Sequence, residues 1–499
     1  MYSGLKGQVK CNGILSNLFN IMIGLRQGCN LSPHLFNIYI NDLPLLLKTA
    51  ECYPVSLNGE KINILAYADD MLILSNSEWG LKKSLQSLQG YCRKWQLVLN
   101  ESKTKIIIFN TTKTSTAKFT FEDKKLEVVK QHTYLGIKIH RSGNFTVAIK
   151  DLYERANKAY YAAKSIMKDC QVSPRLLLRI FDAVVKPILT YCSEIWGAFG
   201  IKKDKYTDLL SHLLSYDKYP YEKLHIKMCK QSLYVPKRTS NIGCLAELGR
   251  VPIMASITTA ILKYYVRIKY SKEYELVNMA IKSQDKLVQN SSKTMTFGEM
   301  ARTINDDLEL NDVCTNGEFS NQYLQKMNNI KSAIKSYGKR ATRSCFKKYE
   351  EYFLNKLRSI RINNDSKLWL YSQIKSKLEY ESYLDVKSDY RNELTKFRLS
   401  IHWLPIERLR YKKPKIERHE RLCMFCKADI GSEMHVLMEC QHSQLINLRQ
   451  KFDKLFQSST ENQSKSDILF KILSGQDHNQ ITIICKFIKE VNDISKKLY

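Results

Sequence analysis

Two adjacent aspartates, Asp69 and Asp70, stand between two apolar runs within residues 62–74. Such runs predict strands, and the acidic pair then falls at the turn that joins them. A tight hairpin holds both carboxylates in one small volume, where a divalent cation relieves their mutual repulsion. Mg²⁺ prefers hard oxygen ligands of this kind, typically one or two carboxylates together with substrate phosphates. The alternative is an ordinary hairpin, because Asp suits many turns.

Three cysteines and a histidine further along the chain have the spacing of a zinc site. They are Cys423, Cys426, His435 and Cys440, separated by two, eight and four residues. Zn²⁺ takes four nitrogen and sulfur ligands in a tetrahedron, and a closed set of three thiolates and one imidazole is typical of a structural site. The spacing therefore predicts one Zn²⁺ ion, with His442 as an alternate ligand. Three unrelated thiols in a reduced core are the other interpretation.

The residues that lead into this zinc segment are rich in cations and aromatic rings. Residues 401–425 contain seven Lys or Arg and three Glu, with Trp403, Tyr411 and Phe425 interleaved. Cations that contact phosphates and rings that stack on bases are together typical of single-strand binding. We therefore predict that this stretch binds nucleic acid.

The aspartate pair needs a scaffold, and the residues upstream of it predict one. Ser32 is a suitable N-cap and Pro33 suits the first helical position, so a helix is expected to begin here. Its core-facing side would carry the apolar residues Leu35, Phe36, Tyr39, Ile40 and Leu43. The sequence thus predicts a helix and then a strand–turn–strand unit with the aspartates at its tip.

The loop before this helix has residue types that suit contact with a nucleotide. Gly24 and Gly28 permit the backbone to approach another backbone or a ligand closely. Arg26 offers a forked donor for phosphate, and Gln27 offers an amide for a base edge or a sugar.

Four sequence motifs, taken in order, carry a family resemblance. They read GLRQGCNLSPHLFNIYIND, LAYADDMLIL, LVLNESKTK and TYLGIKI. Over roughly residues 1–270, and again near the C-terminal end, the chain resembles the reverse transcriptases of non-LTR retrotransposons. Asn30 departs from the proline that is usual in this family, a small change in loop stiffness.

The resemblance implies a role for each matched residue. In the family the Tyr-Ala-Asp-Asp hairpin lies in the polymerase palm, so Asp69 would be the main ligand of two Mg²⁺ ions, with Asp70 beside it. Two such ions, about 3.5–4 Å apart, activate the primer 3′-hydroxyl and stabilise the leaving pyrophosphate. The other matched positions are Arg26, Gln27 and Gly28 against the template and the incoming nucleotide, Tyr67 and Ala68 against the primer terminus, Lys103 near the triphosphate, and Tyr134, Leu135 and Gly136 in the primer grip. A solvated loop lysine is the alternative for Lys103.

The resemblance also predicts an incomplete catalytic set. The family needs a further aspartate, on a strand upstream of the Arg-Gln-Gly segment, that bridges both metals. That motif is expected before the first residues of this chain, MYSGLKGQVK. We therefore expect a truncated element product, without the fingers subdomain or any N-terminal endonuclease, that is inactive alone.

Charge and composition favour an intracellular protein with a polyanionic partner. The chain of 499 residues has 79 Lys and Arg against 49 Asp and Glu, a formal net charge of +30 and a pI of about 9.4. Phosphates suit such a chain because each one that is neutralised releases condensed counterions. The scattered cysteines, the missing secretory signal and the absence of an apolar run of about 20 residues predict a location in the nucleus or cytoplasm, with no transmembrane segment.

We expect an α+β fold organised in five parts. These are a partial palm of antiparallel strands and helices at 1–145, a helical thumb at 146–270, a basic helical linker at 271–395, the zinc-knuckle region at 396–445 and C-terminal helices at 446–499.

The third of these parts contains a regular series of cations. Lys331, Lys335, Lys339, Arg343 and Lys347 recur every four residues, with Arg340 and Lys348 beside them. On a helix this spacing predicts one basic, slowly drifting ridge. The ridge either follows a phosphate backbone or is a solvated helical face.

Two classes of function follow. The first is an RNA-directed DNA polymerase that acts on an RNA template, a DNA primer or target and deoxynucleoside triphosphates. The alternative is a non-catalytic nucleic-acid-binding remnant of a retrotransposon protein. A viral RNA-dependent RNA polymerase is less favoured, because the Tyr-Ala-Asp-Asp motif, Lys103 and the zinc knuckle all resemble retrotransposon proteins instead.

Overall fold

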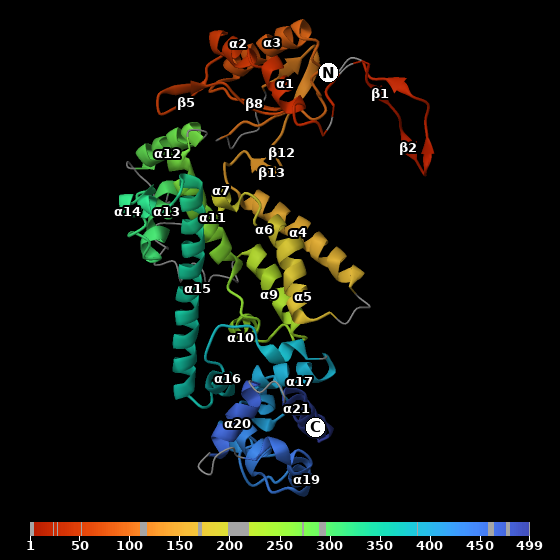
Figure 1. Ribbon diagram of the computed structural model, residues 1–499, viewed down its shortest axis with the longest axis vertical. Helices are drawn as coiled ribbons and strands as arrows, with labels where there is room; N and C mark the ends of the chain where they lie inside the picture. Colours follow the sequence, from red (N-terminus) through yellow and green to blue (C-terminus); the bar gives the residue numbers. More distant parts are fainter. Residues whose placement is uncertain are drawn as a thin grey trace. The chain divides into compact units, whose positions relative to one another are not determined.

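The computed structural model divides the chain into two compact units (Figure 1). The first comprises residues 1–147 with residues 282–284, and the second comprises residues 148–281 and 285–499. The residues that the structure describes are 4–22, 24–26, 28–50, 52–109, 117–167, 172–197, 219–271, 274–288, 296–386, 388–457, 464–475 and 480–498.

The first unit is a set of small sheets around three helices. Its helices are α1 (Ser32–Tyr39), α2 (Leu43–Thr49) and α3 (Glu78–Lys94). The first three antiparallel strand pairs are β1 (Lys6–Gly7) with β4 (Phe19–Asn20), β2 (Lys10–Cys11) with β3 (Ile14–Leu15), and β5 (Val55–Leu57) with β6 (Glu60–Ile62).

Three further sheets complete this unit. Two are two-residue-turn hairpins, β7 (Ile64–Tyr67) with β8 (Asp70–Ile73), and β12 (Gln131–Tyr134) with β13 (Ile137–His140). The third is a three-stranded sheet in which β11 (Lys124–Val128) lies antiparallel to β10 (Phe119–Phe121) and parallel to β9 (Lys105–Ile106).

Helix α3 anchors the core of the first unit. Ser77 caps it by accepting a hydrogen bond from the Gly80 N–H at 3.0 Å. Gly80 suits this position because an added Cβ would lie 2.6 Å from the Cys52 carbonyl oxygen. The core joins α2, α3 and the β9–β11 sheet, and its buried members include Leu43, Leu47, Leu85, Leu88, Tyr91, Ile106, Phe119, Phe121 and Leu126.

Helix α1 begins as expected, but its capping differs from the prediction. Ser32 lies inside the helix, and the N-cap is Leu31, which makes no side-chain capping bond. The Ser32 hydroxyl instead donates to the Arg26 carbonyl at 2.8 Å. The side chain therefore ties the preceding loop to the helix instead of capping it.

The second unit is helical apart from one short strand pair, β14 (Cys314–Thr315) with β15 (Glu318–Phe319), among its described residues. Its first half contains α4 (Thr146–Ile166), α5 (Pro174–Ile180), the π-helical η1 (Phe181–Val185), α6 (Lys186–Leu189), α7 (Ser193–Trp196), α9 (Pro220–Ser232), α10 (Asn241–Glu247) and α11 (Ile253–Tyr270). The next helices are α12 (Glu275–Val288), α13 (Phe297–Asp307), α14 (Asn321–Gln325) and α15 (Ile330–Ile362).

Helix α11 is the central packing element of this half, because it is apolar on most sides. It packs against α7, α9, α13 and the long helix α15 (Figure 1). Eleven of its residues are buried, among them Ile257, Leu262 and Val266.

The remaining helices of the second unit are α16 (Trp369–Ile374), η4 (Ser382–Asp385), α17 (Ser388–Arg398), α18 (Pro405–Arg408), η5 (Leu409–Tyr411), η6 (Arg418–Glu420), η7 (His435–Glu439), α19 (Ser443–Lys451), η8 (Asp453–Leu455), α20 (Lys465–Ser474) and α21 (Ile481–Lys497). The guanidinium of Arg398 is fully buried among them. It pairs with Glu247 at 2.9 Å and Glu381 at 3.1 Å, and donates to the Leu473 carbonyl at 2.6 Å. Because a buried charge requires partners, this network fixes α10, α17 and the end of α20 together.

The α+β fold class predicted from the sequence is confirmed. Small, mainly antiparallel sheets occupy the first unit, and helices dominate the second. None of the described helices combines the length and the apolar character needed to cross a bilayer.

Candidate functional site

The aspartate pair lies where the sequence predicted it, at the tip of a hairpin. In the β7–β8 ladder Tyr67 pairs with Asp70, so Ala68 and Asp69 form the turn. Ala68 has a φ of +52°, which lets the chain reverse within two residues. The side chains of Tyr67, Asp69 and Asp70 are exposed, whereas Ile64 and the residues of β8 beyond Asp70 are partly covered. The hairpin therefore presents two carboxylates and one phenol ring to solvent.

A second hairpin, β12–β13, contributes a neighbour to this pair. Leu135 and Gly136 form its turn with φ of +47° and +79°. Partial burial raises the pKa of the Tyr134 phenol, and the negative charge of the Asp70 carboxylate raises it further. The Asp70 carboxylate thus acts electrostatically on the Tyr134 phenol, although the two residues lie more than 60 positions apart in the sequence.

Arg26 and Gly28 lie ahead of α1, outside the helices and strands. The Arg26 side chain is exposed, and its carbonyl holds Ser32. Gly24 and Gly28 have φ of +97° and +79°, and an added Cβ would meet no atom within 4 Å at either. Their backbone conformation, not close packing, accounts for glycine here. Gln27 lies outside the described residues.

Lys103 lies in a turn that Asn100 stabilises. The Asn100 Oδ1 accepts hydrogen bonds from the Lys103 N–H at 3.2 Å and the Ser102 hydroxyl at 2.8 Å. The Lys103 side chain is exposed. The neighbouring Lys105 forms an ion pair with Glu127 at 2.8 Å. The exposed ammonium of Lys103 is therefore the better placed of the two to bind a ligand.

Among the described residues, no third acidic or imidazole ligand joins Asp69 and Asp70. The one group of three or more His, Cys, Asp or Glu ligands that the described chain gathers is near Cys423. The aspartates suit Mg²⁺ chemically, as one or two carboxylates that leave room for water and phosphate oxygens.

That other group is the predicted set Cys423, Cys426, His435 and Cys440. All four ligand atoms lie within 4.8 Å of one another. The Sγ atoms of Cys423 and Cys440 are 3.9 Å apart, and the Cys426 Sγ is 3.3 Å from the His435 Nε2. A tetrahedron with Zn–S bonds of about 2.3 Å and Zn–N bonds of about 2.0–2.1 Å has edges of about 3.8 and 3.6 Å. The four residues therefore fit a zinc ion.

Their surroundings also suit a metal. The Cys423 N–H donates to the Asp429 carbonyl at 2.7 Å, which closes a short loop. The Asp429 carboxylate lies 3.7 Å from the His435 Nδ1, the orienting contact that metal-binding histidines commonly have. Burial acts to raise the pKa of the Cys426 thiol, but hydrogen bonds from the backbone of Ala428 and Asp429 and from His435 lower it to about 6. Burial raises the pKa of Cys423 to about 12.

His442 lies outside this Cys/His cluster. Its ring packs against Phe425 at 5.6 Å between centroids. The histidine and last cysteine come from a turn of π-helix: His435 begins η7 and Cys440 follows its last residue. Helix α19 begins at Ser443, after the last ligand.

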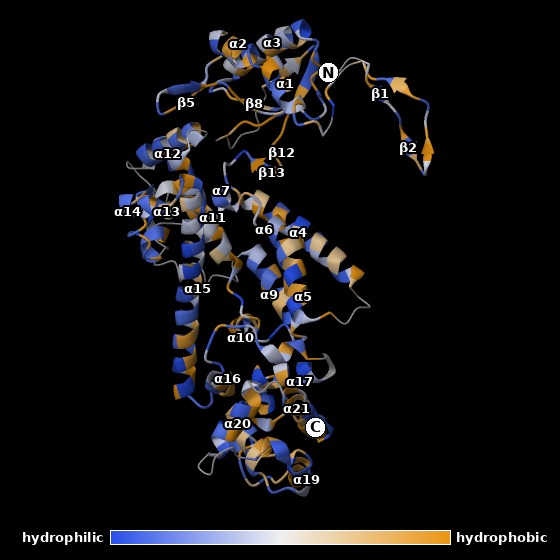
Figure 2. Ribbon diagram, viewed as in Figure 1, coloured by the Kyte–Doolittle hydropathy of each residue, from blue (hydrophilic) through white to orange (hydrophobic). Residues whose placement is uncertain are grey.

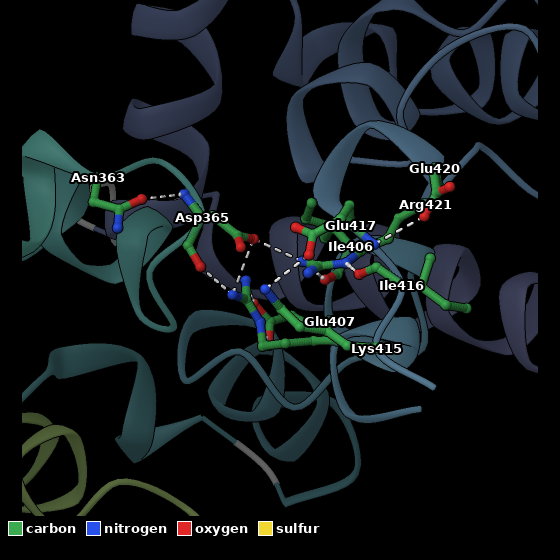
Figure 3. Close-up of polar contacts among 10 residues, drawn as sticks. Asn363, Asp365, Ile406, Glu407, Lys415, Ile416, Glu417, Glu420 and Arg421 are labelled. Atoms are coloured by element: carbon green, nitrogen blue, oxygen red, sulfur yellow. Dashed lines mark hydrogen bonds and ion pairs between the residues drawn. The ribbon is translucent and has the colours of Figure 1, made fainter. Parts of the chain in front are cut away.

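The basic stretch before the Cys/His cluster is shaped by one acidic residue that the sequence did not single out. Figure 3 shows the Asp365 carboxylate reaching the guanidinium of Arg421, at 2.7 Å. Asp365 also pairs with Arg410 at 3.1 Å, and Arg410 pairs with Glu407 at 2.7 Å. Arg421 is 1% exposed and additionally donates to the Ile416 carbonyl at 3.1 Å. Asp365 therefore fixes both ends of the loop at 410–421.

The predicted basic–aromatic surface is smaller than the sequence suggested. Phe425 is 8% exposed and belongs to the core, so its ring is not available for stacking. Trp403 is half-buried, with the Arg408 guanidinium 4.5 Å from its ring centroid. Tyr411 is 60% exposed, with the Lys367 ammonium 5.6 Å from its ring. We name the exposed residues Arg408, Tyr411, Lys412, Lys413 and Lys415 the basic loop.

Comparison with known proteins bears directly on the first unit. Residues 3–139 match the family model for reverse transcriptase (RNA-dependent DNA polymerase). This segment is similar to reverse transcriptases. The matched segment contains both hairpins, the Arg26 loop and Lys103.

Relatives of this reverse transcriptase segment come from mobile elements. The chain is 29% identical over 142 residues to a transposon-derived protein of Caenorhabditis elegans, covering 28% of this chain and 50% of that protein. It is 23% identical over 201 residues to the RNA-directed DNA polymerase from mobile element jockey of Drosophila melanogaster, covering 38% and 21%. It is 28% identical over 196 residues to the Pol polyprotein from a type-1 retrotransposable element of Popillia japonica, covering 36% and 31%. The chain thus spans half or less of these relatives' lengths, and the non-LTR retrotransposon resemblance is confirmed.

Proposed function

We propose that this chain acts in RNA-directed DNA synthesis, as the palm and C-terminal part of a non-LTR retrotransposon reverse transcriptase. The observation that carries the proposal is the exposed Asp69–Asp70 pair at a hairpin tip inside the segment that matches the family. Asp69 and Asp70 would hold Mg²⁺, which supplies positive charge for the attacking 3′-oxygen and the leaving pyrophosphate.

The other side chains of the segment bind and orient the substrates. Tyr67 projects from the same hairpin, 67% exposed, and is suited to lie against the primer terminus. The backbone of the Leu135–Gly136 turn would support the primer strand, because this turn matches the primer grip of the family. Arg26 and Lys103 place cations for the phosphates of the template and the incoming triphosphate. Lys103 serves as a positioning cation for the triphosphate and transfers no proton.

The metal site can be tested without polymerase activity. Fe²⁺ substitutes for Mg²⁺ at carboxylate sites and, with ascorbate and peroxide, cleaves the backbone near the site where it is bound. We expect Fe²⁺-dependent cleavage of the 499-residue chain close to residues 67–71, and loss of this cleavage in Asp69→Asn.

Asp123→Asn is a matched control, because Asp123 is an exposed acidic residue at the turn of another hairpin of the same unit, β10–β11. It should keep the cleavage near residues 67–71. Cleavage that persists in Asp69→Asn, or that Asp123→Asn removes equally, would contradict a metal site at the aspartate pair.

We further propose that the Cys/His cluster binds one Zn²⁺ and that the adjacent basic loop contacts single-stranded nucleic acid. The fit of the ligand distances to a tetrahedron supports the metal. Tyr411 offers the exposed ring of the loop, and Arg408, Lys412 and Lys413 offer cations around it, whereas Lys415 pairs with Glu417 at 2.9 Å. Rings combined with cations in this way bind single strands with little sequence preference.

Affinity for single-stranded RNA and DNA, measured across a salt series, tests this second proposal. Lys412→Ala should lower the slope of log affinity against log salt by about 0.7, the value for one phosphate contact on a single strand. Tyr411→Ala should weaken binding by about 1–3 kcal/mol through lost stacking, with an unchanged slope. Slopes and affinities that neither substitution changes would remove the basic loop from the interface.

A further inference from the structure

The basic series on helix α15 forms a continuous exposed ridge in the structure. Lys331, Lys335, Lys339 and Arg343 are all exposed on this 33-residue helix. We call these four residues the basic ridge. Lys347 continues it and lies 3.7 Å from Glu351.

The ridge keeps to the side of α15 that faces away from the core. The buried residues Ala333, Tyr337, Ala341, Cys345, Tyr349 and Phe353 also recur every four residues. Each ridge residue lies two positions from a member of this buried stripe, which corresponds to a rotation of about 200° around the helix. Both series therefore drift together and stay on opposite faces, so packing against α11 leaves the ridge uncovered along its length.

Acidic neighbours pair with two cations that lie beside the ridge on this helix. Arg340 pairs with Asp312 at 2.6 Å, and Lys348 lies 3.4 Å from Glu309. Within the described part of the chain, none of the four ridge residues has an acidic partner within 4.0 Å. Four uncompensated charges thus line up over about 18 Å, from 12 residues at about 1.5 Å each.

The composition of the exposed face distinguishes among polyanions. A membrane-surface helix exposes large apolar residues between its cations. On α15 the exposed large apolar residues are Ile330 and Ile362, which lie at its two ends, outside the ridge. Figure 2 likewise shows hydrophilic residues along much of the ridge-bearing part of α15. The exposed face also lacks an exposed aromatic ring, the platform on which single-stranded bases stack.

We propose that the basic ridge is a binding surface for the sugar–phosphate backbone of a nucleic-acid duplex. A duplex carries one negative charge per roughly 1.7 Å of axis, so 18 Å of it presents about ten phosphates to four cations. The ridge contacts backbone and reads no bases, because its lysines offer point charges without an aromatic or amide partner. This inference is independent of polymerase activity and of the zinc site.

Duplex affinity of the full chain tests the proposal. The probe is a blunt 25-base-pair DNA duplex, titrated between 50 and 300 mM salt. Lys335→Gln with Arg343→Gln removes two ridge contacts and should lower the slope of log affinity against log salt by about 1.8. If the two proteins bind the duplex equally at 1 M salt, the double variant should bind about 60-fold more weakly than the unchanged chain at 0.1 M salt.

Lys356→Gln with Arg358→Gln is the matched control. It removes one lysine and one arginine from exposed positions on the same helix, about 20 Å beyond Arg343. Its affinity and slope should stay close to those of the unchanged chain. Equal losses in the two double variants would show a general charge effect and overturn the proposal, as would a ridge variant that binds the duplex normally.

Two further measurements keep the result specific. Thermal melts of both double variants should match that of the unchanged chain, because all four side chains are exposed. If the melt of the first ridge variant differs, a second ridge pair, Lys331→Gln with Lys339→Gln, replaces it. Binding to vesicles containing 30% phosphatidylserine should be the same in ridge and control variants. A loss of vesicle binding in the ridge variant, with duplex binding retained, would assign the surface to membranes and overturn the proposal.

Discussion

Replacing Cys423 by serine should detach the metal and unfold the segment at 420–443. Cys423 is 1% exposed and its Sγ lies 3.9 Å from that of Cys440, so it occupies one vertex of the ligand tetrahedron. A serine hydroxyl at this position supplies no thiolate, and it is buried without a charged partner.

The magnitude follows from what else holds the segment. Its buried apolar side chains are Phe425, Val436 and Leu437. At about 1.5–3 kcal/mol for each fully buried side chain they contribute about 5–9 kcal/mol. A structural zinc contributes about 10–16 kcal/mol of folding free energy. The metal thus stabilises the segment more than these three side chains do, and we expect its loss to unfold the segment locally while the Arg398 network holds the remaining helices.

Zinc content per chain, limited proteolysis and thermal melting form the assay. The unchanged chain should contain one equivalent of zinc and resist cleavage between residues 420 and 443. Cys423→Ser should contain less than one equivalent and be cut there.

Cys485→Ser is the control, because Cys485 is equally buried but lies in α21, outside the Cys/His cluster. It should keep its zinc. One full equivalent of zinc in Cys423→Ser, or its absence from the unchanged chain, would refute the reasoning.

Three further predictions concern the basic loop and the aspartate hairpin. Asp365→Asn should destabilise the second unit by about 2 kcal/mol in urea melts at pH 7, less than the 3–5 kcal/mol of a fully buried pair because Asp365 is 32% exposed. Burial acts to raise the pKa of Asp365, but hydrogen bonding from Arg421 and the charges of Arg410 and Arg421 lower it overall. The stabilisation by Asp365 therefore exists above the ordinary carboxyl pKa of 3.8 and disappears as the pH falls through the lowered value. A difference in unfolding free energy between the unchanged chain and Asp365→Asn that is as large at pH 3 as at pH 7 would contradict this prediction. Arg408→Ala should weaken single-strand binding modestly in the same salt titration. Tyr134→Phe should leave Fe²⁺-dependent cleavage near residues 67–71 in place, since its phenol is a neighbour of Asp70 and not a metal ligand.

Local patterns were enough to predict the hairpin and the Cys/His cluster. Two apolar runs around Asp69 and Asp70 specify strands and a turn within a dozen residues. The cysteine spacing likewise needs only a short loop to bring its four ligand atoms together. In both cases the information lies within the segment that forms the feature.

Features that depend on distant residues were not predictable in this way. Asp365 pairs with Arg410 and Arg421, which lie 45 and 56 residues further along the chain. The polar residues around Asp365 in the sequence do not indicate either partner. The burial of Phe425 is equally set by packing. No local pattern in the sequence links the β7–β8 and β12–β13 hairpins, so the effect of the Asp70 charge on Tyr134 was not predictable either.

Primer extension on an RNA template tests the central claim most directly. The 499-residue chain and a version extended upstream along its reading frame should be compared with Mg²⁺ present, each with Asp69→Asn and with the hairpin-turn control Asp123→Asn. We predict little extension by the 499-residue chain, since no third ligand joins the aspartate pair among its described residues, and robust extension by the longer one. Asp69→Asn should abolish that extension and Asp123→Asn should preserve it. Extension by the longer chain that survives Asp69→Asn would contradict a catalytic metal site at the β7–β8 hairpin.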